Sequence, residues 1–224
     1  MGIEFFPFLV IGAHLFKHEW ASDAEILLGI KDIESTRNGL LLLGAIEKAY
    51  DRSRLCFLKS STNDSFCLRI LDPSLRGADL LAASTEFITK EECDKVGFSV
   101  DGAMIILAKL LTIDGKLLTF GDLEGRSLIY KGKTRPYRRC LNFQAARARS
   151  YALKRGWISP DVIFKYSWSE NFDDSVQLEK YLETLGTSFE DLEAGTNLES
   201  TYVDDIMPAD AVDEQNSDSG SEFS

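Results

Sequence analysis

Short apolar runs separated by turn residues dominate the first part of the chain. Residues 5–16 crowd Phe, Leu, Val and Ile into one run, and residues 40–43 are four consecutive leucines. Apolar runs of this length are typical of buried strands. The Asn38-Gly39 dipeptide marks a turn before the leucines, because both residues favour turn conformations. Residues 44–51 then read as a short helix, so this part of the chain predicts two strands followed by a helix.

Weaker patterns follow along the chain. Residues 55–58 and 66–71 are strand-like on either side of the polar turn KSSTND, which predicts a hairpin. Residues 103–111 are so uniformly apolar that a helix and a buried strand fit equally well. Residues 114–130 read as a turn, a strand, a DLEG turn and a second strand. A further helix start is expected at Ser22, which has a glutamate three residues on.

The clearest helical pattern covers residues 137–155, where Ala, Leu, Arg and Gln dominate. Four residues share one apolar face: Leu141, Ala145, Ala148 and Ala152. Gly156 is expected to end the helix. Beyond residue 188 the composition of Asp, Glu, Ser and Asn favours disorder, although a helix from about residue 175 is compatible with the pattern.

Charge divides the chain unevenly. Residues 170–224 carry 16 Asp or Glu and one Lys, a net charge of −15, whereas residues 1–169 carry a net charge of +4. We therefore expect an α+β protein with three regions. These are residues 1–75 with the strand–strand–helix unit, residues 76–170 as a mixed extension with a basic helix, and residues 171–224 as an acidic, largely disordered tail.

The cysteines argue against two classes of protein. Cys56, Cys67, Cys93 and Cys140 are scattered without a CxxC pair, which disfavours a zinc ribbon and a secreted disulfide framework. No apolar run reaches the length of a membrane span, and the apolar start lacks a basic segment and a cleavage site. We expect an intracellular protein, cytoplasmic or nuclear, without a membrane segment.

Two short motifs carry candidate chemistry. The first is GAHLF, in which His14 ends the first strand, and the second is NGLLLLGAIEKAYD, which runs from Asn38 to Asp51. In order and spacing they resemble the motifs of the HNH nuclease family. That family has an AH motif, followed by NGLLL and a helix that carries H-x-x-F-D. Here Tyr50-Asp51 matches the aromatic–Asp pair, and Glu47 stands where the family usually has a histidine.

The resemblance implies a fold and a set of roles. The fold is a pair of strands and a helix around one divalent metal, with added strands and a basic C-terminal helix in this chain. His14 matches the base that activates water against a DNA phosphodiester, and Asn38 matches the residue that orients this base. Glu47 and Asp51 match the helix positions that hold the metal.

This chemistry is physically sensible. Attack on a negatively charged phosphodiester needs a cation on the phosphate and a base that titrates near neutrality, as imidazole does. Side chains four apart on a helix point the same way, so Glu47 and Asp51 can meet at one ion. Two carboxylates favour Mg²⁺ over zinc. The alternative for Glu47 and Asp51 is a solvated helix face on which they pair locally with Lys48 and Arg52. The alternative for His14 is a hydrogen-bonded structural residue. His18 is expected to be a surface residue.

A basic segment follows later in the chain. Residues 126–155 contain ten Lys or Arg, no Asp or Glu, and interleaved aromatic residues. Such a segment is typical of a phosphate-binding surface. The candidate DNA contacts are Arg138, Arg139, Arg147, Arg149, Lys154 and Arg155. The alternative is an amphipathic helix whose arginine stems cover apolar neighbours. The tail either keeps the protein in solution or folds back on this segment and competes with nucleic acid.

Three functions remain open from the sequence. The preferred one is an HNH-type endonuclease, fully active or impaired by Glu47, which uses a divalent metal and no small-molecule cofactor to cleave DNA. The second is an inactive HNH-like module that binds nucleic acid or a protein. The third is an interaction protein whose acidic tail recruits a basic partner.

Overall fold

A computed structural model describes residues 9–61, 65–130 and 134–164. All of them belong to one of the chain's two compact units, Met1–Gly186. The predicted acidic tail of residues 171–224, the helix expected from about residue 175, and two of the basic residues, Lys131 and Lys133, lie outside the described residues.

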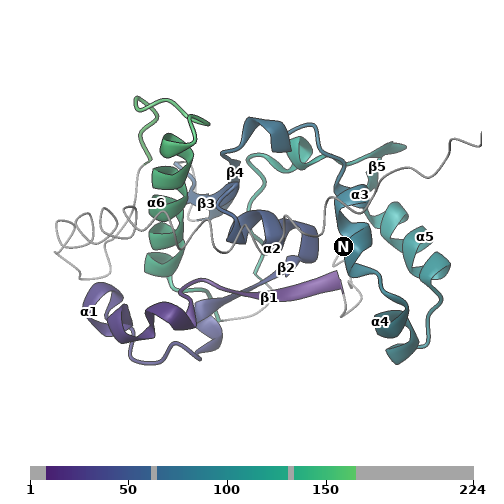
Figure 1. Ribbon diagram of the computed structural model, residues 1–224, viewed down its shortest axis with the longest axis horizontal. Helices are drawn as coiled ribbons and strands as arrows, with labels where there is room; N and C mark the ends of the chain where they lie inside the picture. Colours follow the sequence, from purple (N-terminus) through teal and green to yellow (C-terminus); the bar gives the residue numbers. More distant parts are fainter. Residues whose placement is uncertain (1–8, 62–64, 131–133, 165–224) are drawn as a thin grey trace, which may run out of the picture. The chain divides into compact units, whose positions relative to one another are not determined.

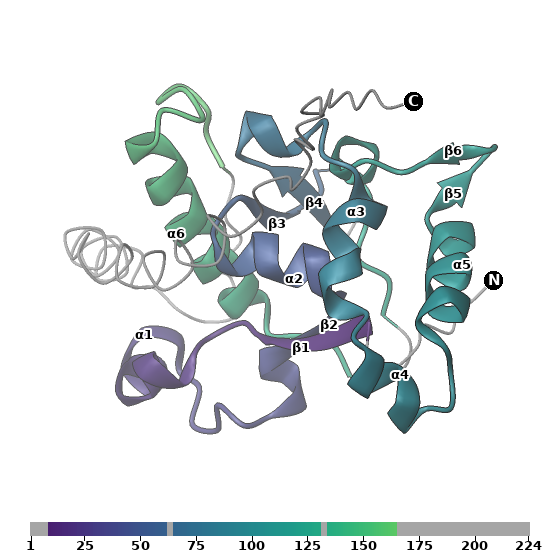
Figure 2. The ribbon, with the colours of Figure 1, turned by 45° about the vertical axis from the view of Figure 1, so that its right-hand side comes forward.

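The predicted strand–strand–helix unit is confirmed. Strands β1 (Val10–His14) and β2 (Gly39–Leu43) pair antiparallel, with His14 opposite Gly39. Helix α2 (Gly44–Asp51) begins directly after β2 and contacts both strands, and it lies along the hairpin in both ribbon views (Figures 1 and 2). Apolar side chains of the two strands and of α2 join one core cluster.

The connection between β1 and β2 is made of short helical turns, which are η2 (His18–Asp23), α1 (Ala24–Leu28) and η3 (Thr36–Asn38). The predicted cap was wrong, because Ser22 lies inside η2 and Asp23 precedes α1. Gly29 ends α1 in the left-handed conformation, with a φ of 59°. This connection brings Ile33 and Asn38 back to the end of β1.

A second hairpin supports the long C-terminal helix. Strands β3 (Leu55–Lys59) and β4 (Phe66–Ile70) pair antiparallel as predicted. Helix α6 (Arg138–Lys154) packs against β3, and all four residues of its predicted apolar face are buried. Gly156 follows α6 with a φ of 68°. The expected helix and its glycine stop are therefore confirmed.

The middle of the chain contains more helix than the sequence predicted. It comprises η4 (Pro73–Leu75), α3 (Leu80–Ser84), η5 (Thr85–Phe87), α4 (Lys90–Lys95), α5 (Val100–Leu110), β5 (Thr112–Ile113), β6 (Lys116–Leu117) and η6 (Phe120–Leu123). The open choice at residues 103–111 is settled as helix. The second strand expected near residue 130 was wrong, because this stretch contributes only an isolated bridge from Ser127 to Cys67.

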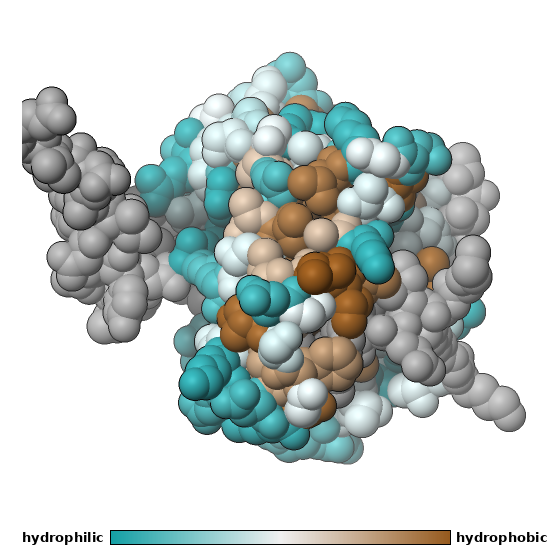
Figure 3. Space-filling view, turned by 90° about the vertical axis from the view of Figure 1, so that its right-hand side faces the viewer, coloured by the Kyte–Doolittle hydropathy of each residue, from teal (hydrophilic) through white to brown (hydrophobic). Residues whose placement is uncertain are grey.

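Exposed apolar side chains gather around α4, α5 and the β5–β6 hairpin. They are Val96, Phe98, Val100, Ile105, Ile113 and Leu117. Figure 3 shows this face with its concentration of hydrophobic residues. Helix α5 buries Ala103 and Leu107 fully, exposes Val100 and Ile105, and leaves its other apolar residues half-buried. Because apolar residues occupy buried, half-buried and exposed positions alike, the sequence pattern could not mark the period of the helix.

One close contact ties α2 to the middle of the chain. A Cβ added to Gly44 would lie 2.6 Å from the ring of Phe87 in η5. Only glycine therefore permits this approach at the first residue of α2.

The predicted α+β architecture is confirmed. Among the described residues no helix combines the length and apolar character needed to cross a membrane.

Candidate functional site

The buried amide of Asn38 holds the loop that follows His14. Asn38 is 1% exposed. Its Oδ1 accepts a hydrogen bond from the backbone N–H of Phe16 at 2.8 Å, and its Nδ2 donates to the carbonyls of Phe16 at 2.8 Å and Ile33 at 2.9 Å. Both amide hydrogens and the amide oxygen are therefore used. Because a buried polar group without a partner is costly, this arrangement fixes the chain on both sides of the site.

A second buried amide supports the same loop from α6. The Nε2 of Gln144 donates to the carbonyl of Leu15 at 2.6 Å, and the backbone N–H of Leu15 donates to the carbonyl of Asn38 at 2.9 Å. Sequence reasoning missed Gln144. A polar residue directly before Ala145 on the buried side of a strongly helical segment was the available signal, because buried amides are normally hydrogen-bonded.

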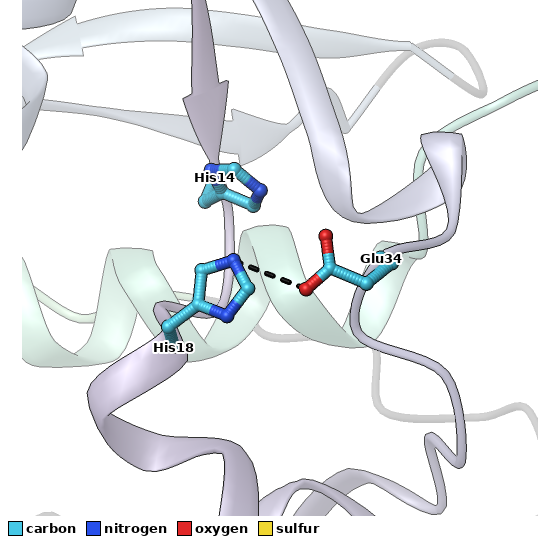
Figure 4. Close-up of side chains that lie close together, drawn as sticks. All are labelled: His14, His18 and Glu34. Carbon is cyan, nitrogen blue, oxygen red and sulfur yellow. Dashed lines mark ion pairs between the residues drawn. The ribbon is translucent and has the colours of Figure 1, made fainter.

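The imidazole of His14 lies in a group of three side chains that could hold a metal ion. The ligand atoms of His14, His18 and Glu34 all lie within 4.8 Å of one another, and all three residues are exposed. Figure 4 shows the rings of His14 and His18 beside the carboxylate of Glu34, with His18 Nε2 3.2 Å from Glu34 Oε1. The two rings meet edge to face, with centroids 5.0 Å apart.

Sequence reasoning placed His18 correctly at the surface but missed its nearness to His14. The spacing of four residues between the two histidines was a signal. Glu34 could not be found from spacing, because it reaches the histidines only through the fold of the connection between β1 and β2.

Glu47 and Asp51 form a separate acidic pair on α2. Burial is the main cause that raises the pKa of Glu47, and the negative charge of Asp51 adds to it, whereas Lys17 acts in the opposite direction. The Nζ of Lys17 lies 3.3 Å from Asp51 Oδ2. Like charges that crowd in this way are stabilised by a nearby cation. The residues therefore fit a hard cation that prefers oxygen ligands, which is the kind that the resemblance implies.

The two groups remain distinct. Among the residues that the structure describes, neither Glu47 nor Asp51 belongs to a group of three possible ligands within 4.8 Å of one another. The structure thus joins His14 to His18 and Glu34, and Glu47 to Asp51 and Lys17, without merging them at this distance. The assigned roles of His14, Asn38, Glu47 and Asp51 stay predictions.

The six basic candidates for nucleic-acid contact differ in their surroundings. Arg147 stacks over the ring of Trp20 at 4.9 Å, and burial lowers its pKa while Glu19 and Asp51 act against this shift. Arg149 donates to the carbonyls of Val162 and Pro160. Both guanidinium groups thus have contacts within the protein, and Arg147 also extends the charged surroundings of Asp51.

The other four candidates lie at the ends of α6. Arg138 and Arg139 are half-buried, and the guanidinium of Arg139 lies 5.4 Å from the centroid of the Tyr137 ring. Lys154 and Arg155 are exposed at the opposite end, where Arg155 Nε donates to the hydroxyl of Tyr151 at 3.0 Å. Contact of any of the six with DNA stays a prediction.

Comparison with known proteins agrees with the two motifs. A family model of the HNH endonucleases matches residues 3–58. This segment is similar to the HNH endonucleases. The suspected resemblance to the HNH family is thereby confirmed, and the matched segment contains β1, β2 and α2. No curated protein and no solved structure matches the chain.

Proposed function

We propose that the chain is an HNH-type nuclease that hydrolyses phosphodiester bonds of DNA with the help of a divalent cation, of which Mg²⁺ is the first choice. The observation that carries the proposal is the match of residues 3–58 to the HNH endonucleases. The arrangement of β1, β2 and α2 supports it, because this segment forms the two strands and the helix that the family's chemistry requires. A cytoplasmic or nuclear location belongs to the same proposal and agrees with four free cysteines.

In this proposal His14 acts as the base. Its imidazole takes a proton from a water molecule while the water oxygen attacks phosphorus. The bond from phosphorus to the leaving sugar oxygen breaks, and that oxygen takes a proton from solvent. Asn38 and Gln144 keep the backbone beside His14 in place, since they hold Phe16 and Leu15. Such positioning matters because a displacement of about 1 Å can cost about 100-fold in rate.

In the same proposal, Glu47 and Asp51 act on the scissile phosphate by holding a cation next to it. A divalent cation held by Glu47 and Asp51 would supply positive charge to the scissile phosphate. Lys17 and Arg147 lie near Asp51 and add fixed positive charge on the same side. Exposed Lys154 and Arg155 are proposed to contact the DNA backbone farther along α6, together with the half-buried Arg138 and Arg139.

Plasmid nicking tests the proposal. Supercoiled plasmid is incubated with the full chain and Mg²⁺ or Mn²⁺, with a chelator as the blank. We expect nicking that falls at least about 100-fold in His14→Ala, as for loss of a general base. Lys31→Ala is the matched surface control, because its side chain is 84% exposed and lies in neither group. Nicking by His14→Ala at the rate of Lys31→Ala would contradict the proposal.

A second function is favoured by one specific observation. The ammonium of Lys17 already lies 3.3 Å from Asp51, and Glu47 replaces the family's helix histidine. The ammonium of Lys17 places a fixed positive charge beside the carboxylates. A protein that binds nucleic acid without cleaving it needs such a charge but no metal ion. Binding of a fluorescent duplex that weakens with salt, without cleavage in Mg²⁺ or Mn²⁺ and without change in Glu47→Ala, would select this function.

A further inference from the structure

A second metal site can be argued from side chains outside the acidic pair. His14 ends β1, His18 begins η2, and Glu34 lies in the connection that returns to β2. Their ligand atoms lie within 4.8 Å of one another. The three side chains converge from two separate stretches of chain on one exposed point (Figure 4).

The donor set selects a class of metal. Two imidazole nitrogens and one carboxylate oxygen form a common ligand set of zinc sites that keep a fourth position open. Imidazole suits zinc and its neighbours, whereas Mg²⁺ and Ca²⁺ prefer oxygen ligands. The acidic pair on α2 has the opposite preference. The chain therefore carries an imidazole-rich group and a carboxylate group that differ in the ions they favour.

The distances fit this class of ion. Ligands about 2.0–2.1 Å from a tetrahedral ion lie roughly 3.3 Å from one another. The separation between His18 Nε2 and Glu34 Oε1 is 3.2 Å, so these two atoms already span such an edge. The side chains of His18 and Glu34 are 57% and 68% exposed, which leaves them room to rotate and close the remaining distances to His14.

The backbone beneath the three ligands is fixed in advance. One Nδ2 atom, that of Asn38, donates both to the carbonyl of Phe16, two residues after His14, and to that of Ile33, the residue before Glu34. The backbone N–H of Glu34 also donates to Asp32 Oδ1 at 3.0 Å. The buried amide therefore ties together the two stretches that supply the ligands, which lowers the entropy cost of binding an ion.

We propose that His14, His18 and Glu34 form a binding site for Zn²⁺ or a chemically similar transition metal ion. The site is distinct from the acidic pair. A consequence that rests on the proposed function is that zinc bound to His14 occupies the ring nitrogen needed by the base. Zinc at this site then inhibits cleavage supported by Mg²⁺.

Zinc binding by the full chain is measured directly. Metal is removed with a chelator and dialysis, and Zn²⁺ is titrated in competition with a chromophoric chelator. Co²⁺ serves as a second probe, because its visible absorption reports tetrahedral coordination. His18→Ala and Glu34→Ala are each expected to weaken zinc binding at least about tenfold, because loss of even a group that only supports a ligand costs about 10- to 100-fold.

Matched controls separate this site from others. Glu25→Ala removes an exposed glutamate, 64% exposed in its side chain, that lies outside the group. Cys67→Ser removes the half-buried thiol. Both are expected to bind zinc as the unaltered chain does. Equal zinc binding by His18→Ala, Glu34→Ala and the unaltered chain would overturn the proposal, and so would the lack of binding at micromolar zinc.

Inhibition is scored against each variant's own cleavage rate in Mg²⁺ alone. Zinc should reduce the rate of the unaltered chain by more than tenfold and that of His18→Ala by much less. Nicking without zinc binding would overturn the metal site and leave the nuclease intact. Zinc binding without nicking in any metal would overturn the nuclease and leave the metal site intact. The two proposals therefore fail separately.

Discussion

Two groups of possible metal ligands near the HNH-type strands and helix differ in exposure and in donor atoms. The group of His14, His18 and Glu34 is exposed, rich in nitrogen ligands and supported by a fully bonded amide. The pair of Glu47 and Asp51 contains only carboxylates, and burial and mutual repulsion raise the pKa of Glu47. The comparison shows that the segment matched by the family carries two groups of possible ligands with different donor atoms, nitrogen-rich in one and oxygen-only in the other.

The largest expected effect comes from removing the support of the histidine group. In Asn38→Asp both donors of the buried amide are lost, and a carboxylate faces the carbonyls of Phe16 and Ile33. We expect the free energy of unfolding to fall by about 3 kcal/mol or more. Urea denaturation followed by fluorescence measures this change.

Gln144→Glu is the graded control for that variant, because it removes a single donor, to Leu15. We expect about half the loss. A loss in Asn38→Asp no larger than that in Gln144→Glu would show that the two donated hydrogen bonds of Asn38 do not stabilise the fold more than the single one of Gln144.

The next largest effect is expected from a substitution that gives the acidic pair a nitrogen ligand, as the histidine group has. Glu47→His restores the family's helix histidine and removes the repulsion with Asp51. If the new nitrogen ligand contributes about 1.4 kcal/mol, the metal concentration for half-maximal cleavage falls about tenfold. Plasmid nicking over a series of Mn²⁺ concentrations measures the shift. Lys48→Ala, on the same helix, is the control, and an unchanged metal dependence in Glu47→His would argue against a metal role for this position.

A smaller effect tests the packing of the helix that carries the acidic pair. Tyr50 is 4% exposed, and its hydroxyl has no hydrogen-bond partner among the described residues. Tyr50→Phe, which restores the phenylalanine of the family motif, should raise the free energy of unfolding by about 1 kcal/mol. Thermal and urea denaturation measure it. Tyr151→Phe should not stabilise, since the hydroxyl of Tyr151 accepts a hydrogen bond from Arg155.

The smallest effect depends on pH. The pKa of Glu47 is raised above its ordinary value of 4.5 in the folded chain, so its ionised form destabilises the fold. Glu47→Gln should therefore raise the free energy of unfolding at pH 7, by less than about 1 kcal/mol because the group is partly solvated. Urea denaturation measures this gain at each pH. The gain should shrink as the pH falls through the raised pKa and should vanish only well below 4.5, where the carboxyl is protonated in both the folded and the unfolded state. A gain that stays undiminished at pH 3 would contradict a raised pKa of Glu47 in the folded chain.

Local signals predicted the elements close to the two motifs. The leucines of β2, the bounds of α2 and the buried face of α6 follow from short-range pattern and were confirmed. The choice at α5 could not be made, because apolar residues fill its buried, half-buried and exposed positions alike. Hydrophobic periodicity reveals a helix only when polar residues alternate with apolar ones, and a helix without a clear polar face offers no such period.

The candidate site was less accessible to sequence reasoning. His14 and Asn38 could be placed because motif order identifies them. The nearness of Glu34 to His14, and that of Lys17 to Asp51, depends on the path of the connection between β1 and β2. Long-range contacts of this kind have no periodic signature, since they arise from loop geometry and buried amides.

The buried amide of residue 38 has a consequence for judging related chains. Its bonds to Phe16 and Ile33 serve folding whether or not catalysis survives. Descendants that had lost all cleavage would still be selected to keep an asparagine there. An asparagine at this position is therefore no evidence by itself that a related chain cleaves DNA.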